Sequence, residues 1–270
     1  MSAGHWNRRQ FVGVALSTSV ITIGGSVAPA FGATESIRRF AIVQSTALPI
    51  DSARIKDDLA RNLTRILQII EHHAAPHDWL AFDDAPLTGH AASVLPATDV
   101  SLGDEDLEKL LSAARHHHCW ISLGAVRQAR DSILVLSPTG DQQEWPMPPR
   151  HAPLPLIERV LEESNVPPIV TLNEQRIALV PIDARAEVIA ECAERKVDIM
   201  ITMGSGAGCI APQTTHAAPS LLIQVHAAAP WQPPGCHTEG ISRSRAFDAR
   251  GTVLAECPSP GEHVLVLAGI

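Results

Sequence analysis

The stretch RIALVPIDARAEVIAECAERKVDIMIT, at residues 176–202, restricts the fold more than any other part of the chain. An apolar strand is followed by a sharp turn, an amphipathic helix and a second apolar strand, and strands joined in this way run parallel in one sheet. Active sites of such sheets collect at the carboxyl ends of the strands. The first strand ends in Pro181, whose side chain cannot react and whose backbone lacks an N–H group. This turn therefore raises the question of whether the chain is an enzyme.

Strands and helices alternate along the chain from Ile37 onward. Helices are predicted where apolar residues recur at helical spacing, and strands where short apolar runs are bounded by turn residues. Besides the unit above, helices are expected within residues 54–75 and 103–118, and strands within residues 38–46, 78–89, 119–126, 132–141, 220–229, 242–256 and 263–270. Residues 141–170 and 203–220 break the rhythm and are predicted to be loops. This order of elements predicts an α/β domain in which helices cover sheet faces.

The first 32 residues have the features of an export signal. Arg8 and Arg9 precede Phe11 and an uncharged stretch diluted by glycine and serine, which ends in small residues around Ala30. This pattern resembles a twin-arginine signal peptide, and its glycines and serines make a membrane span the weaker alternative. We expect a leader at 1–32, a single domain at 33–270, and a protein that is periplasmic or secreted, with no membrane attachment after cleavage.

Charge and cysteine content exclude several classes of function. The formal net charge is −8, and no basic cluster with interleaved aromatic residues occurs, so we expect no nucleic-acid partner. The five cysteines have no zinc-like pairing and lie at positions Cys119, Cys192, Cys209, Cys236 and Cys257. An oxidising compartment allows a disulfide such as Cys209–Cys236, although the sequence does not establish a pairing.

Four stretches in order resemble the carbon–nitrogen hydrolase (nitrilase) superfamily. They are FAIVQSTALPIDSARIKDDLARNLTRILQII, which includes Gln44 and Asn62, DWLAFDDAPLTG, the stretch at 176–202, and ISRSRAFDARGTVLAECPSPGEHVLVLAGI. The resemblance covers about residues 37–270 with gaps. It implies a four-layer α-β-β-α sandwich that pairs into homodimers. It also implies hydrolysis of an amide or nitrile by a cysteine nucleophile, a glutamate base and a lysine that stabilises the developing negative charge.

The catalytic positions of the family are occupied by different residues here. The glutamate matches Asp84, whose carboxylate sits one methylene closer to the backbone. The lysine should fall near PMPPRHAP, where Arg150 is the only cation of fixed charge. The cysteine matches Pro181, which removes both the nucleophile and a backbone donor.

These replacements predict an exported nitrilase-like protein that lacks the usual hydrolysis and binds a small amide, nitrile or carboxylate. A divergent hydrolase is the alternative, because Cys209 follows a strand at the same sheet edge and could present a relocated thiol to Asp84. A structural or partner-binding role without a ligand pocket is a third hypothesis. No cofactor is expected under any of them.

Two histidine-rich segments suggest metal binding at first sight. In RHHHC, His116, His117 and His118 are consecutive and point in different directions on a helix, whereas ligands on one helix face lie three or four residues apart. In EHHAAPH, His73 and His77 have that spacing, but Pro76 interrupts the turn. We interpret both segments as polar helix ends, where cationic histidine is favourable, and predict no metal site.

Overall fold

The computed structural model describes residues 17–22, 37, 39–89, 95–147, 169–172, 174–181, 186–204, 219–226, 243–259 and 261–268. Two of the predicted site residues, Arg150 and Cys209, lie outside these ranges, as do Cys236 and most of the predicted leader. Side chains are not described for Ser17–Thr22 or for Pro181. None of the described helices is long and apolar enough to cross a membrane.

The first sheet has seven strands in the order β1-β13-β2-β3-β4-β5-β6. Their bounds are β1 Ser17–Thr22, β2 Arg39–Gln44, β3 Asp78–Ala81, β4 Trp120–Arg127, β5 Arg130–Leu136, β6 Gln142–Pro146 and β13 His263–Ala268. Strands β2, β3 and β4 are parallel neighbours, whereas β13 joins β2 in antiparallel pairing. The parallel core of this sheet therefore comes from the first half of the chain and is completed by β13.

The second sheet has six strands in the order β12-β11-β10-β9-β8-β7. Their bounds are β7 Ile169–Leu172, β8 Gln175–Pro181, β9 Ile199–Gly204, β10 Leu221–His226, β11 Arg245–Asp248 and β12 Val253–Glu256. Strands β8, β9 and β10 are parallel, as the stretch at 176–202 predicts. The predicted hairpin at 248–251 joins β11 and β12, where Gly251 takes a positive φ that glycine tolerates without strain.

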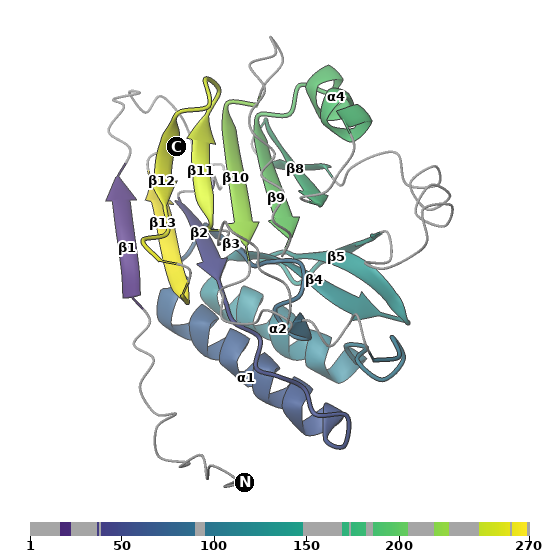
Figure 1. The fold of residues 1–270 in the computed structure, drawn as a ribbon. Coiled ribbons are helices and arrows are strands. Elements are labelled where there is room, and N and C mark those ends of the chain that lie inside the picture. Colours follow the sequence, from purple (N-terminus) through teal and green to yellow (C-terminus); the bar gives the residue numbers. More distant parts are fainter. Residues whose placement is uncertain are drawn as a thin grey trace, which may run out of the picture.

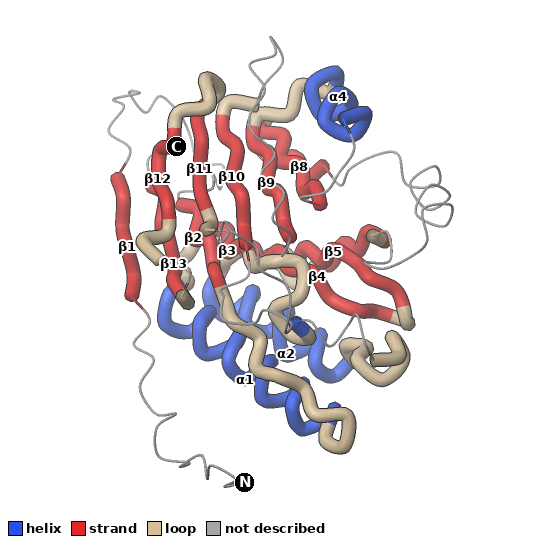
Figure 2. The backbone as a smooth tube through the Cα atoms, viewed as in Figure 1, coloured by secondary structure: helices blue, strands red, loops and turns tan. Residues whose placement is uncertain are grey.

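Helices cover the outer faces of both sheets, which gives four layers (Figures 1 and 2). Helices α1, Ile55–His73, and α2, Asp104–His117, lie side by side on the first sheet, and α4, Ala186–Glu194, lies on the second. Strand alternation sends one side-chain set toward the helices and the other into the space between the sheets. For example, Ala41 and Val43 pack with α1, while Phe40 and Ile42 pack against the second sheet. The predicted α-β-β-α sandwich is confirmed.

Three segments differ from the sequence-based expectation. Ile169–Leu172 begins inside the predicted loop 141–170 and forms β7 at the edge of the second sheet. Gln142–Pro146 was expected in a loop, but it forms β6 at the edge of the first sheet, paired with β5. This strand is mostly exposed and is held by backbone pairing, so it has no apolar pattern to reveal it. Ser17–Thr22, within the predicted leader, forms β1 at the opposite edge and pairs in parallel with β13. Because β1 is an edge strand, the six other strands remain paired to one another without it.

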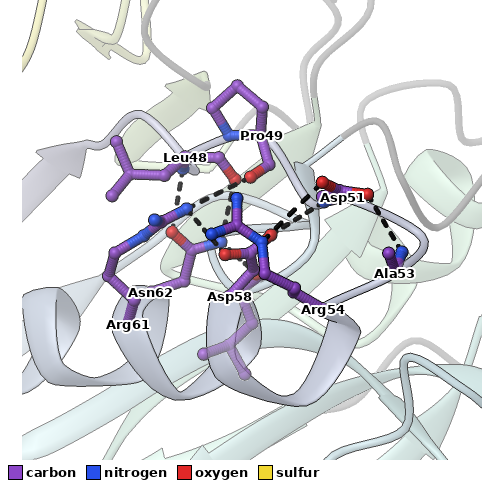
Figure 3. A network of polar contacts seen from close by, with 9 residues as sticks. Leu48, Pro49, Asp51, Ala53, Arg54, Asp58, Arg61 and Asn62 are labelled. Carbon is purple, nitrogen blue, oxygen red and sulfur yellow. Dashed lines mark hydrogen bonds and ion pairs between the residues drawn. The ribbon is translucent and has the colours of Figure 1, made fainter.

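A polar network around Asn62 fixes the loop between β2 and α1 (Figure 3). The buried amide of Asn62 donates to Leu48 O at 3.1 Å and Leu87 O at 2.7 Å, and it accepts from Leu48 N at 2.9 Å. Asp58 accepts from Asp51 N at 2.8 Å and pairs with Arg61 at 3.0 Å. Asn62 therefore joins the loop that follows β2 to the loop that follows β3.

We expect Asn62→Ala to destabilise the protein by about 2–4 kcal/mol, because it leaves one buried and two partly buried backbone groups without their partner. Equilibrium denaturation in urea measures the change. The matched control is Thr64→Ala on the exposed face of the same helix, where the Thr64 hydroxyl donates to the Ala60 carbonyl. It should cost less than about 0.5 kcal/mol, and equal costs for the two variants would contradict the role of Asn62.

Candidate functional site

The carboxyl ends of the parallel strands of both sheets meet at one edge. Gln44, the last residue of β2, is fully buried, and its Oε1 accepts from Ser244 N at 2.7 Å. The Ser244 hydroxyl in turn accepts from His226 N at 3.0 Å, and His226 ends β10. The end of β2 therefore lies against the end of β10.

The order of the strands extends this arrangement to the predicted site. The strand orders of the two sheets advance in the same direction across the sandwich, since β2 faces β10 and β13 faces β12. Strand β3 follows β2 in one sheet, and β9 and β8 follow β10 in the other. Asp84, just beyond β3, and Pro181, the end of β8, therefore lie at the same edge of the sandwich.

Two adjacent carboxylates follow β3 and have different surroundings. Asp83 is 1% exposed, and its carboxylate accepts from Ala85 N at 2.7 Å and from the Ser45 hydroxyl at 3.2 Å. The first bond closes a tight turn of the kind that aspartate favours. Asp84 is only half-buried. Asp83 thus anchors the turn, and Asp84 is the carboxylate that the turn presents.

Gly124 in β4 makes room for this turn. Its N–H donates to Asp83 O at 3.0 Å. A Cβ at position 124 would lie 2.0 Å from Asp84 O and 2.5 Å from Asp84 Cα, which is much shorter than van der Waals contact. Because these are backbone atoms, they cannot move aside as the end of a flexible side chain could. The position of Asp84 therefore depends on the absence of a side chain at residue 124.

The end of β8 has no nucleophile. Pro181 is the last residue of β8 and aligns with Met203 of the parallel strand β9. Proline offers neither a reactive side chain nor an N–H donor at this strand end. Met203 and Gly204, which end β9, have no nucleophilic side chain either.

The described cysteines are unsuited to nucleophilic attack. Cys119, Cys192 and Cys257 are buried, free thiols. Burial raises the pKa of Cys119 to about 12, that of Cys192 to about 11 and that of Cys257 to about 12. A thiol attacks as its thiolate, so these three side chains remain unreactive at neutral pH.

His226 is a second buried polar group at this edge. It is 1% exposed, and neither ring nitrogen has a well-aligned hydrogen bond within the described part of the chain, although the Gly204 backbone lies close enough to favour the charged ring. Desolvation, followed by the positive charge of Arg245, lowers the pKa of His226 to about 4, so the ring is neutral at pH 7. Leu222 packs beneath α4, and His226 follows it on the same face of the strand. The imidazole therefore lies on the outer face of the second sheet.

The sequence pattern points to Asp84 and Pro181 but not to the residues that position them. Ser45, Asp83 and Gly124 act through pairing between β2, β3 and β4, which the sequence does not show. The adjacent Asp83 and Asp84 are the one signal that the sequence offers. Two neighbouring carboxylates after a buried strand indicate that one side chain anchors the turn and the other is presented by it. Neither Arg150 nor Cys209 is placed, since both lie outside the described residues.

Comparison with solved structures relates this architecture to known proteins. A cysteine-to-alanine variant of the Nesterenkonia AN1 amidase superposes with a TM-score of 0.62 at 16% identity, over 88% of this chain and 93% of that chain. XC1258 from Xanthomonas campestris, a CN-hydrolase superfamily protein, gives a TM-score of 0.63 at 15% identity, over 85% of this chain and 89% of that chain. The fold is that of the nitrilase superfamily. No family model matches the sequence, and no curated protein does.

Within this nitrilase fold, Gly124→Ala should destabilise the protein by about 3 kcal/mol, because the new methyl group collides with the backbone of Asp84. Denaturant melts of the two proteins measure the loss. Gly103→Ala is the matched control, since a Cβ there meets no atom within 4 Å. Gly103 is the N-cap of α2, where alanine is less favourable than glycine, so the control should lose about 1 kcal/mol. A Gly124→Ala variant no less stable than the control would contradict the close approach.

His226 should make the nitrilase-fold domain sensitive to acid. Its folded pKa of about 4 lies below the ordinary value of 6.5, so on acidification the unfolded chain takes up the proton first. Stability should therefore fall as the pH drops from about 6.5 to about 4, by about 2–3 kcal/mol from this group between pH 7 and about 4.5. Urea melts across this range should show a smaller loss for His226→Gln than for the wild type. The same loss in both proteins would exclude His226 as the cause.

Proposed function

We propose that this chain is an exported protein with the nitrilase fold that binds a small amide, nitrile or carboxylate and does not hydrolyse it by the cysteine mechanism of the superfamily. The observation that carries the proposal is Pro181 at the end of β8, where the resembled family has its nucleophile. Without a thiol at this strand end, no covalent intermediate can form there.

The surroundings of Asp84 support a binding role. Ser45, Asp83 and Gly124 build the turn that presents Asp84. A half-buried carboxylate can accept hydrogen bonds from the N–H₂ group of an amide. Arg150, at the position of the family lysine, would pair with the oxygen of an amide or with a carboxylate.

The proposed ligand class follows the solved neighbours. A variant of the Nesterenkonia AN1 amidase was determined in complex with acrylamide and another in complex with butyramide. These are small neutral amides with one donor and one acceptor group. A site that keeps a carboxylate and a guanidinium can bind both groups even though the nucleophile is absent.

Export and assembly are further parts of the proposal. The leader at 1–32 would direct the folded protein through the twin-arginine route and be removed, so the mature chain would be periplasmic or secreted and would lack β1. The six other strands of the first sheet pair with one another without it. Following the resemblance, we propose that the mature domain forms a homodimer.

A divergent hydrolase is the second candidate. Strand β9 ends at Gly204 beside the end of β8, so the segment that follows, which includes Cys209, begins at the same edge as Asp84. In this alternative Asp84 takes the proton of the Cys209 thiol, the resulting thiolate attacks the amide carbon, and ammonia leaves with that proton; water then hydrolyses the thioester to the acid and restores the thiol.

The test measures catalysis and binding separately on the mature protein. We expect no release of ammonia from acrylamide, butyramide or simple nitriles above a buffer blank, and we expect these amides to raise the melting temperature because a ligand stabilises the folded state that binds it. Asp84→Asn should abolish the thermal shift. The control Asp57→Asn, an exposed carboxylate in the first turn of α1, should keep it.

Two further results would decide between the candidates. Ammonia release that is lost in Cys209→Ala and in Asp84→Asn would contradict the proposal and establish the hydrolase. Absence of both turnover and thermal shift would refute the ligand site. A Pro181→Cys variant offers a positional check with fluoroacetamide, whose acetamide moiety adds to the active-site cysteine of the Nesterenkonia amidase. Labelling at residue 181 that slows in Pro181→Cys/Asp84→Asn would place the two residues together.

A further inference from the structure

The carboxyl ends of α1 and α2 lie together at the edge opposite the candidate site. Each helix connects two parallel neighbouring strands of the first sheet, so each runs back from the carboxyl edge to the amino edge. The helices pack against one another (Figure 1). Near these ends lie Glu71 in the last turn of α1, and His116 and His117 at the end of α2.

Three potential metal ligands converge at this place. One ligand atom from each of Glu71, His116 and His117 lies within 4.8 Å of the other two. His117 Nε2 is 2.9 Å from Glu71 Oε2, and the rings of His116 and His117 are 4.8 Å apart and nearly perpendicular. The three consecutive histidines of one helix give no sign in the sequence of a carboxylate from another helix. The contact between the helices supplies that third group.

We propose that Glu71, His116 and His117 form a binding site for a divalent transition-metal ion of the Zn²⁺ type, with water as the fourth ligand. Imidazole nitrogen and carboxylate oxygen are ligands that Zn²⁺ takes in tetrahedral sites. His117 would ligate through Nε2 with its proton on Nδ1. Mg²⁺ and Ca²⁺ prefer oxygen ligands, so the two histidines select against them.

The observed geometry needs only small movements to coordinate an ion. Ligand atoms about 2.1 Å from Zn²⁺ in a tetrahedron lie about 3.4 Å from one another. Since the widest separation here is 4.8 Å, rotation of the side chains suffices. Glu71 and His116 are exposed, so their side chains can turn toward an ion without meeting a packed core, while His117 is 16% exposed and is the more enclosed member of the site.

The local field favours a cation. The carboxyl end of a helix carries a partial negative charge, and two such ends meet here. Glu71 adds a full negative charge. An ion bound by residues of both helices would fasten α1 to α2. The site lies at the amino edge of the first sheet and Asp84 at its carboxyl edge, so the site is independent of the proposed amide site.

Calorimetric titration of the untagged protein with Zn²⁺ tests the site. We expect one Zn²⁺ per chain to bind at micromolar concentrations and to raise the melting temperature, because the ion binds the folded state. Mg²⁺ should do neither. Glu71→Gln and His116→Ala should each weaken Zn²⁺ binding at least about tenfold, since each removes a ligand and neither residue is buried.

The matched control is His118→Gly. His118 belongs to the same histidine run but has a positive φ as the C-cap of α2, a conformation that glycine tolerates, and it is not part of the cluster. This variant should bind Zn²⁺ like the wild type. Unchanged Zn²⁺ binding in both ligand variants, or no Zn²⁺ binding by the wild type, would overturn the proposal. Asp84→Asn should leave Zn²⁺ binding intact, so the outcome is separate from the test of amide binding.

Discussion

The arrangement of the candidate site depends on one buried amide. Gln44 ends β2 inside the sandwich, where it donates to Ser259 O at 2.9 Å and Gly261 O at 2.6 Å and accepts from Ser244 N. Apolar packing between the sheets has no direction and would tolerate sliding, whereas hydrogen bonds to a buried amide require a fixed partner. Gln44 therefore sets which strand ends meet, and the positions of Asp84 and Pro181 follow from it.

The turn after β3 and the end of β8 contribute differently to the candidate site. The turn at Asp83 and Asp84 is held by the Asp83 carboxylate, by the Ser45 hydroxyl and by the close approach of Gly124. The Asp84 carboxylate is therefore presented at the sheet edge. At the end of β8, Pro181 offers neither a reactive side chain nor an N–H donor. The position of the carboxylate and the supply of a nucleophile thus depend on different residues.

Local patterns in the sequence predicted most elements but few of the contacts between them. Helices α1 and α2 and the unit from β8 to β9 begin and end close to the expected residues, because their apolar spacing and helix ends are local properties. Strand β6 was missed because an exposed edge strand is stabilised by pairing rather than by burial. The approach of Gly124 to Asp84 joins β4 to β3, and the meeting of Glu71 with His117 joins two helices. Such contacts between distant residues have no local signature.

The topology also sets the order in which the protein can be completed. Strand β13, residues 263–268, lies inside the first sheet beside β2, which was synthesised more than 200 residues earlier. Until those residues leave the ribosome, one side of β2 has unpaired backbone groups and the sheet is open. Closure is therefore a late, long-range event with a high cost in loop entropy.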